Sequence, residues 1–129
     1  MDPISDMIIR IKNAAMVGKD VVSVPQSSLK TAIAQKLKER GIISGVTPRG
    51  KKTTKLLELT LARAEDGSYR FTNVKRISKP GRRVYLGSSD IRPVRGGLGT
   101  LVLSTPKGIL LGDEARKENV GGEALFEIW

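Results

Sequence analysis

The chain has 129 residues, enough for one domain or for two small domains that share a modest core. Its 23 Lys and Arg outweigh its 13 Asp and Glu, and the net charge of +10 is typical of proteins that bind nucleic acid. The absence of cysteine and histidine excludes disulfides, thiolate chemistry, the usual zinc sites and imidazole catalysis. Because no stretch approaches about 18 apolar residues and no basic leader opens the chain, we expect a soluble cytoplasmic protein.

The chain opens with a predicted helix and a short strand. Asp2-Pro3 is a typical helix start, because the Asp2 side chain can accept from free backbone N–H groups and proline suits the first helical position. Apolar residues then recur at helical spacing over residues 4–15, and Gly18 ends the helix. Residues 21–24 predict a strand, which Pro25 closes.

A second helix and a hairpin complete this part of the chain. The helix begins at Ser27 or Ser28, and Gly41 stands where a left-handed C-terminal cap belongs. Residues 42–46 predict a strand, and residues 55–61 alternate between apolar and polar side chains as its hairpin partner would. Residues 1–64 are therefore predicted as an α-β-α-β-β lobe.

Residues 69–129 are predicted as a second lobe rich in β-structure. Glu65 to Ser68 is typical of a turn and is the expected boundary between the lobes. One short helix is expected from about Asp113 to Asn119. The fold class is thus α+β, with the N-terminal lobe packed directly on the C-terminal lobe. Its strands are predicted at residues 69–77, 83–86, 100–104, 108–111 and 125–128.

Two glycine-containing segments resemble nucleotide-binding loops without completing them. Gly45 to Lys51 has the spacing of a phosphate-binding loop, but Lys52 replaces the metal-binding hydroxyl and no helix follows, which favours a basic hairpin loop. Gly96 to Gly99 lacks the third glycine of a dinucleotide fingerprint and is predicted as a turn. The acidic residues are scattered, so we expect no catalytic site, no bound metal and no cofactor.

Positive charge is concentrated in the middle of the chain. Residues 49–95 hold 13 basic and 4 acidic residues, a balance of +9. Five cations lie within residues 75–83, which a purely structural loop has no reason to tolerate. Tyr85 follows them and would either stack on a base or pack in the core. Other basic side chains are RNA-contact candidates or parts of a solvated face: Lys30 on the second helix, and Lys51, Lys52 and Lys55 in the hairpin.

Two stretches of small residues near the C-terminus are the most informative part of the sequence. Residues 104–108 read Ser-Thr-Pro-Lys-Gly, and residues 121–123 read Gly-Gly-Glu, each at the edge of an apolar run. Both are plausible as simple turns between strands. Hydroxyls, a lysine and backbone without side chains also suit a surface that lies against a ribose-phosphate strand and reaches base edges. We predict that the two stretches lie side by side as one RNA-reading patch.

The chain resembles the small-subunit ribosomal protein S8 family from end to end. The resemblance is carried by these stretches, in order: residues 2–7, 10–14, 25–30, 32–34, 37–42, 76–81 with Arg83 and Tyr85, 97–99, 104–105, 107–109, 115–116 and 121–123. It implies a two-domain protein that binds a stem in the central domain of small-subunit rRNA early in assembly. It also implies neighbouring small-subunit proteins as partners, and repression of its own operon through the mRNA.

The resemblance also implies which residues contact RNA. The family forms much of its RNA surface from a Ser-Thr-Ser-x-Gly turn and a Gly-Gly-Glu turn. In this chain the matching residues are Ser104, Thr105, Lys107, Gly108, Gly121, Gly122 and Glu123, to which the charge pattern adds Tyr85, Arg82, Arg83, Lys30 and Lys55.

Two positions depart from the family pattern. Pro106 replaces a second serine, which removes one hydroxyl and one backbone N–H, and Leu111-Gly112 replaces Thr-Asp, so that Asp113 is expected to cap the next helix. Two other functions stay open on the residues alone. One is a regulatory module that binds mRNA away from the ribosome, and the other is a small phosphate-handling enzyme built on the loop at residues 45–51.

Overall fold

The structure is a computed structural model that describes residues 2–51 and 53–129, so Lys52 of the predicted basic hairpin lies outside the described residues. The chain forms two compact units, Pro3–Phe71 and Thr72–Trp129, with Asp2 assigned to the second. We call them the first and second units. The expected α+β class is confirmed, since α-helices accompany two antiparallel sheets.

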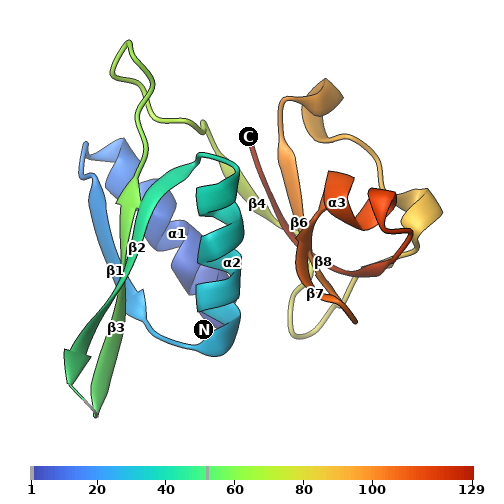
Figure 1. The fold of residues 1–129 in the computed structure, drawn as a ribbon, viewed down its shortest axis with the longest axis horizontal. Helices are drawn as coiled ribbons and strands as arrows, with labels where there is room; N and C mark the ends of the chain where they lie inside the picture. The colour runs from blue at the N-terminus through green and yellow to red at the C-terminus, as the bar shows by residue number, and fades with distance from the viewer. Residues whose placement is uncertain (1, 52) are drawn as a thin grey trace. The chain divides into compact units, whose positions relative to one another are not determined.

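The first unit has the predicted α-β-α-β-β order (Figure 1). Its elements are α1 (Pro3–Met16), β1 (Val21–Pro25), α2 (Ser28–Glu39), β2 (Ile43–Lys51) and β3 (Thr54–Leu61). The strands are antiparallel in the order β1-β3-β2. Alternate residues of β1 are buried, and each helix buries one apolar stripe, so the sheet and the helices share a core.

Both ends of α2 form as the sequence predicts. Ser27 is the N-cap, and its hydroxyl accepts from the backbone N–H of Lys30 at 3.1 Å. Gly41 follows the helix with a φ of 86°, a left-handed conformation that glycine adopts without steric cost. These two residues fix where α2 begins and ends.

The expected hairpin loop at Gly45 to Lys51 is wrong, because this segment is the edge strand β2. Its pairing with β3 continues until Lys51 lies opposite Thr54. Pro48 is compatible with the strand because an edge strand has one unpaired side, where a missing N–H costs nothing. The segment has no helix N-terminus to hold a phosphate, which removes the structural basis of the phosphate-handling alternative.

The turn at residues 65–68 lies within the first unit. Arg63 stacks on the Tyr69 ring, with 4.3 Å from its guanidinium carbon to the ring centroid, and donates to the Asp20 carboxylate at 2.9 Å. The Tyr69 hydroxyl also donates to Asp20 at 2.9 Å. Hydrogen bonds from Tyr69 and then Arg63 hold the pKa of Asp20 below its ordinary value. This network ties residues 62–70 to the loop after α1.

The second unit is mostly β-structure, as predicted. Its strands are antiparallel in the order β4-β8-β6-β7, and β5 also pairs with β8. Its elements are β4 (Val74–Arg76), β5 (Tyr85–Leu86), two short 3-10 helices (Ser88–Asp90 and Val94–Gly97), β6 (Thr100–Thr105), β7 (Gly108–Leu111), α3 (Gly112–Lys117) and β8 (Gly122–Ile128) (Figure 1).

The boundaries of several elements in the second unit differ from the prediction. The two strands predicted at residues 69–77 and 83–86 are shorter than expected, since regular strands extend over Val74–Arg76 and Tyr85–Leu86, each paired with β8. β8 begins at Gly122, so the second glycine belongs to a strand and not to a turn. Helix α3 begins at Gly112 with Leu111 as its N-cap residue, and the Glu114 carboxylate accepts from the Leu111 N–H at 2.9 Å, so Asp113 lies in the first turn and is not the N-cap residue.

One face of the second sheet carries an apolar cluster. Buried apolar residues gather there: Ile91, Leu101, Leu103, Leu110, Ala115 and Ala124. Because side chains alternate along a strand, the neighbours of Leu103 and Ala124, namely Ser104 and Glu123, point to the other face. Among residues 2–51 and 53–129, no helix is long and apolar enough to cross a membrane.

Candidate nucleic-acid interface

Three residues from three strands lie side by side on the face of the second sheet opposite the apolar cluster of Leu103 and Ala124. Ser104 of β6 and Tyr85 of β5 each lie directly opposite Glu123 of β8. Directly opposed residues in antiparallel strands project from the same face. We call these three residues the strand row. Tyr85 is 69% exposed, whereas the side chain of Glu123 is only 13% exposed.

The two small-residue stretches meet at the end of the strand row. A Cβ placed on Gly122 would lie 2.1 Å from the Ser104 carbonyl oxygen and 3.0 Å from the Cα of Thr105. A Cβ on Gly121 would lie 2.3 Å from the Leu86 carbonyl oxygen. Real Cβ atoms do not approach so closely, so both positions require glycine. The absence of side chains there lets the start of β8 lie against the backbones of β5 and β6.

The two neighbouring hydroxyls of β6 have different roles. Thr105 Oγ1 donates to the Gly108 carbonyl at 2.7 Å and accepts from the Lys107 N–H at 3.1 Å, which closes the turn between β6 and β7. The Ser104 hydroxyl makes no hydrogen bond within the described part of the chain. The Ser104 hydroxyl is therefore without a partner among the described residues, whereas Thr105 uses its hydroxyl to hold the turn.

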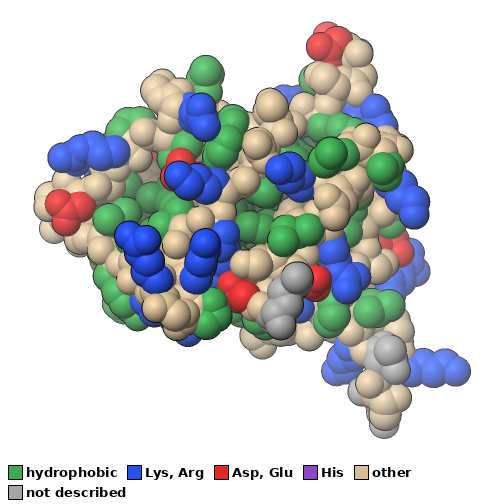
Figure 2. All heavy atoms as spheres, turned by 180° about the vertical axis from the view of Figure 1, so that it is seen from behind, with side chains coloured by type: hydrophobic (Ala, Val, Ile, Leu, Met, Phe, Trp, Pro, Cys, Tyr) green, Lys and Arg blue, Asp and Glu red, His purple; other side chains and the backbone are tan. Residues whose placement is uncertain are grey.

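The basic side chains near the strand row differ in whether they contact an acidic residue. Arg83 Nη1 donates to the Glu123 carboxylate, at 3.1 Å from Oε2 and 3.4 Å from Oε1. Arg82 lies in a tight turn whose backbone groups bond to those of Lys79 at 2.9 Å, and its side chain is exposed. Lys107, in the β6–β7 turn, is half-exposed and lies 3.7 Å from Glu118. Figure 2 shows one face of the molecule, on which Lys and Arg side chains are prominent.

Lys30 is buried, although the sequence analysis named it as a candidate for RNA contact. It is 6% exposed, and its ammonium donates to the Pro25 carbonyl oxygen at 3.1 Å. That carbonyl belongs to the last residue of the edge strand β1, so Lys30 satisfies a backbone acceptor that β3 does not reach. Its burial and this hydrogen bond remove Lys30 from the candidate interface.

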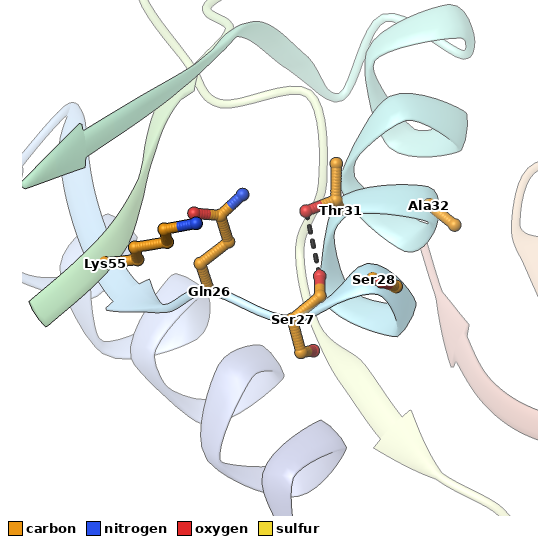
Figure 3. A pocket seen from close by; sticks show the side chains of 6 residues that line it. All are labelled: Gln26, Ser27, Ser28, Thr31, Ala32 and Lys55. Atoms are coloured by element: carbon orange, nitrogen blue, oxygen red, sulfur yellow. Dashed lines mark hydrogen bonds between the residues drawn. The ribbon is translucent and has the colours of Figure 1, made fainter. Parts of the chain in front are cut away.

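Lys55 lies in the first unit beside a group of polar side chains (Figure 3). An open hollow there is lined by Gln26, Ser27, Ser28, Thr31, Ala32 and Lys55. The Thr31 hydroxyl donates to the Ser27 carbonyl at 2.8 Å, and the Gln26 N–H donates to the Lys55 carbonyl at 3.1 Å. The helix N-terminus, the hydroxyls and Lys55 together suit an anionic ligand.

Comparison with known proteins identifies the family. The family model described as "Ribosomal protein S8" matches residues 2–129. Proteins named small ribosomal subunit protein uS8 are similar over nearly their whole length. The one from Roseiflexus castenholzii is 46% identical over 128 residues, 99% of this chain and 97% of its own length. The one from Chloroflexus aurantiacus is 47% identical over 130 residues, with the same two shares.

The chain belongs to the ribosomal protein S8 family. The resemblance found in the sequence is thereby confirmed, and so is its expected place on the ribosome. The S8 match covers both units, so neither unit is an addition to the family fold. Within the described ranges 2–51 and 53–129, no group of three or more acidic residues is placed to hold a metal ion.

The departure of this chain from the S8 pattern at Pro106 has a structural counterpart. Pro106 is exposed and follows Thr105 in the turn that the Thr105 hydroxyl closes. Proline fixes φ at the second position of a tight turn, and Gly108 with a φ of 105° completes the reversal. The turn is thus held by the ring of Pro106 and the hydroxyl of Thr105, while the Ser104 hydroxyl stays available.

The sequence did not point to the polar side chains around Lys55. Ser27 and Ser28 stood out only as a helix start, and Gln26 and Thr31 carried no signal of their own. The pairing of β3 with β1 places Lys55 beside the start of α2, which no local pattern could indicate. A run of hydroxyl residues before a helix, followed by a lysine in a nearby strand, is the signal that could have found this group.

We expect Lys30→Ala to act on stability and not on RNA recognition. The change removes a buried aliphatic stem and leaves the Pro25 carbonyl without its partner, which should lower the free energy of unfolding by about 2 kcal/mol. Urea unfolding followed by far-ultraviolet circular dichroism measures the loss. Lys38→Ala, at an exposed position of the same helix, should change stability by less than about 0.5 kcal/mol. A Lys30→Ala variant that keeps its stability and loses RNA binding would contradict this assignment.

Proposed function

We propose that this chain is a non-enzymatic structural protein of the small ribosomal subunit that binds directly to a stem in the central domain of small-subunit rRNA. The strand row is the observation that carries the proposal. It brings the exposed ring of Tyr85 and the Ser104 hydroxyl onto one sheet face beside Glu123, whose carboxylate accepts a hydrogen bond from Arg83. The glycines at 121 and 122 keep the adjoining backbone free of side chains.

Different residues of the proposed surface supply affinity and specificity. Exposed cations such as Arg82 supply attraction to phosphates, which every RNA offers and salt weakens. The Ser104 hydroxyl can hydrogen-bond a base edge or a 2′-hydroxyl, and the Tyr85 ring can stack on an unpaired base. Such contacts need irregular RNA, because bases in a regular A-form helix are not exposed to an aromatic ring. The surface therefore fits a stem with displaced bases better than a uniform duplex.

The same surface is proposed to serve the other partners that the family resemblance implies. Binding to the rRNA stem would support early assembly of the subunit, with neighbouring small-subunit proteins joining afterwards. An mRNA of its own operon that folds into a similar stem would compete for the strand row and allow repression. Competition between the two RNAs for one protein site is the expected behaviour.

Binding of the full chain to two RNAs tests the proposal. One is a central-domain stem of small-subunit rRNA, and the other has the same nucleotides in scrambled order. We expect the stem to bind at least about a hundredfold more tightly at physiological salt. We also expect the protein to sediment with small subunits, at about one copy per subunit. Equal affinity for both RNAs, together with absence from the small-subunit fraction, would refute the proposed function.

We expect Arg82→Ala to weaken binding to all RNAs alike. An exposed cation that meets a phosphate releases about one counterion, so its loss should reduce the slope of log affinity against log salt by about one unit. Titrations of the stem and the scrambled RNA at several salt concentrations measure the slope. Lys117→Ala, at an exposed position on α3, carries the same charge change and serves as the control. An unchanged slope for Arg82→Ala removes this residue from the phosphate contacts.

A further inference from the structure

A carboxylate in the middle of a surface that binds a polyanion needs an explanation. Glu123 lies between Tyr85 and Ser104 in the strand row. Its charge repels phosphate, so Coulomb's law alone would favour a neutral residue there. Either the carboxylate accepts hydrogen bonds from the RNA, or it acts on a neighbouring protein group.

The geometry of Glu123 favours the second role. Both of its carboxylate oxygens face one nitrogen, Nη1 of Arg83, at 3.1 and 3.4 Å. Its side chain is 13% exposed, so little of the carboxylate is open to an incoming ligand. Arg83, by contrast, is 55% exposed. The exposed member of this pair is the cation.

The pair leaves most of the guanidinium available. Only Nη1 of Arg83 contacts Glu123, and within residues 2–51 and 53–129 its Nε and Nη2 atoms have no hydrogen-bond partner. A guanidinium has five N–H donors in a planar fork, which can bind a phosphate through two parallel hydrogen bonds. An arginine that is already oriented loses less side-chain entropy when it binds. Among the described residues the Arg82 side chain has no such partner.

We infer that Glu123 is a positioning residue that holds the Arg83 guanidinium so that its remaining N–H donors meet an RNA phosphate beside the strand row. This inference rests on the proposed RNA-binding function and names the phosphate partner of one residue within it. Glu123 contributes to affinity through Arg83, against the direct effect of its own charge. The two effects have opposite signs, which makes them separable by experiment.

A double-mutant cycle with Glu123→Gln and Arg83→Ala separates them. The probe is the central-domain rRNA stem, bound by the full chain at several salt concentrations. Glu123→Gln removes a negative charge, yet we expect it to weaken binding by about fivefold because Arg83 loses its orientation. In the Arg83→Ala background the same change should leave affinity unchanged or tighten it. The effect of Glu123→Gln therefore reverses or vanishes when Arg83 is absent.

Glu127→Gln is the matched control on the same strand. It carries the same charge change, and Glu127 has no arginine partner among the described residues. We expect Glu127→Gln to tighten RNA binding slightly or leave it unchanged. Unfolding in urea, followed through Trp129 in the second unit, shows whether each variant is folded. Should Glu123→Gln not fold, Glu123→Asp replaces it, because it keeps the charge, shortens the reach to Arg83, and must still weaken binding.

Each result decides the inference. Tighter binding by Glu123→Gln in the wild-type background overturns it, because charge then outweighs positioning. Equal weakening in both backgrounds also overturns it, because Glu123 would then act on the RNA without Arg83. Unchanged binding by Glu123→Asp, where that variant is needed, has the same meaning. Failure of the wild-type chain to prefer the stem over scrambled RNA refutes the proposed function itself, and the two failures are thereby distinguished.

Discussion

Gly122→Ala should destabilise the second unit by about 3 kcal/mol, the upper end of the usual cost of overpacking. The new Cβ would lie 2.1 Å from the Ser104 carbonyl oxygen, an atom of the backbone of β6 that cannot rotate away. Either β8 separates from β6 at this end or the strand row loses its register. Trp129 is the single tryptophan of the chain and lies in the second unit, so urea unfolding followed by its fluorescence reports the change.

Gly81→Ala is the control for this substitution. A Cβ on Gly81 would have no heavy atom within 4 Å, and its backbone is not in the left-handed region. We expect its stability to stay within about 0.5 kcal/mol of wild type. Gly122→Ala that is as stable as Gly81→Ala would show that the close approach of β8 to β6 does not exist in solution.

Ser104→Ala should weaken binding of the rRNA stem by about 1–3 kcal/mol, between about fivefold and about 150-fold, with little effect on scrambled RNA. The hydroxyl makes no hydrogen bond within the described residues, so its removal should leave the protein folded. The RNA then loses a hydrogen-bonding partner that can both donate and accept. Titrations with both RNAs under one salt condition measure the difference in selectivity.

Two further variants bracket this result. Ser89→Ala removes an exposed serine side chain elsewhere in the second unit and should leave selectivity unchanged. Thr105→Ser keeps the hydroxyl that closes the β6–β7 turn and should bind nearly as well as wild type. If Ser104→Ala loses affinity equally for both RNAs, Ser104 has no part in choosing the RNA.

The first unit follows from local sequence signals. Ser27 caps α2 through a hydrogen bond three residues away, and Gly41 ends it through its own backbone conformation. Both effects depend on neighbours within one helical turn, so a single sequence contains them. The extent of β2 was not predictable in this way. Its basic and glycine-containing sequence is typical of a loop, and only pairing with β3 keeps it extended.

The candidate site depends more on distant partners. Gly121 and Gly122 carry the same signal whether they form a turn or allow a close approach, and the backbones that distinguish these cases belong to β5 and β6. Arg83 and Glu123 are 40 residues apart, so their ion pair has no sequence pattern. Lys30 is misleading in the opposite way. A lysine on an amphipathic helix is expected to be exposed, and Lys30 is buried because its ammonium donates to the Pro25 carbonyl at the end of β1.

Nuclear magnetic resonance of the isotope-labelled full chain, with and without the central-domain rRNA stem, tests the strand row most directly. The account predicts that the largest amide shifts on binding fall at Tyr85, at Ser104 to Gly108 and at Gly121 to Glu123. Scrambled RNA should shift the amide signals of the basic segments and leave those of Ser104 and Gly122 unchanged. The account would be contradicted if the stem still bound selectively and its largest amide shifts fell at other residues.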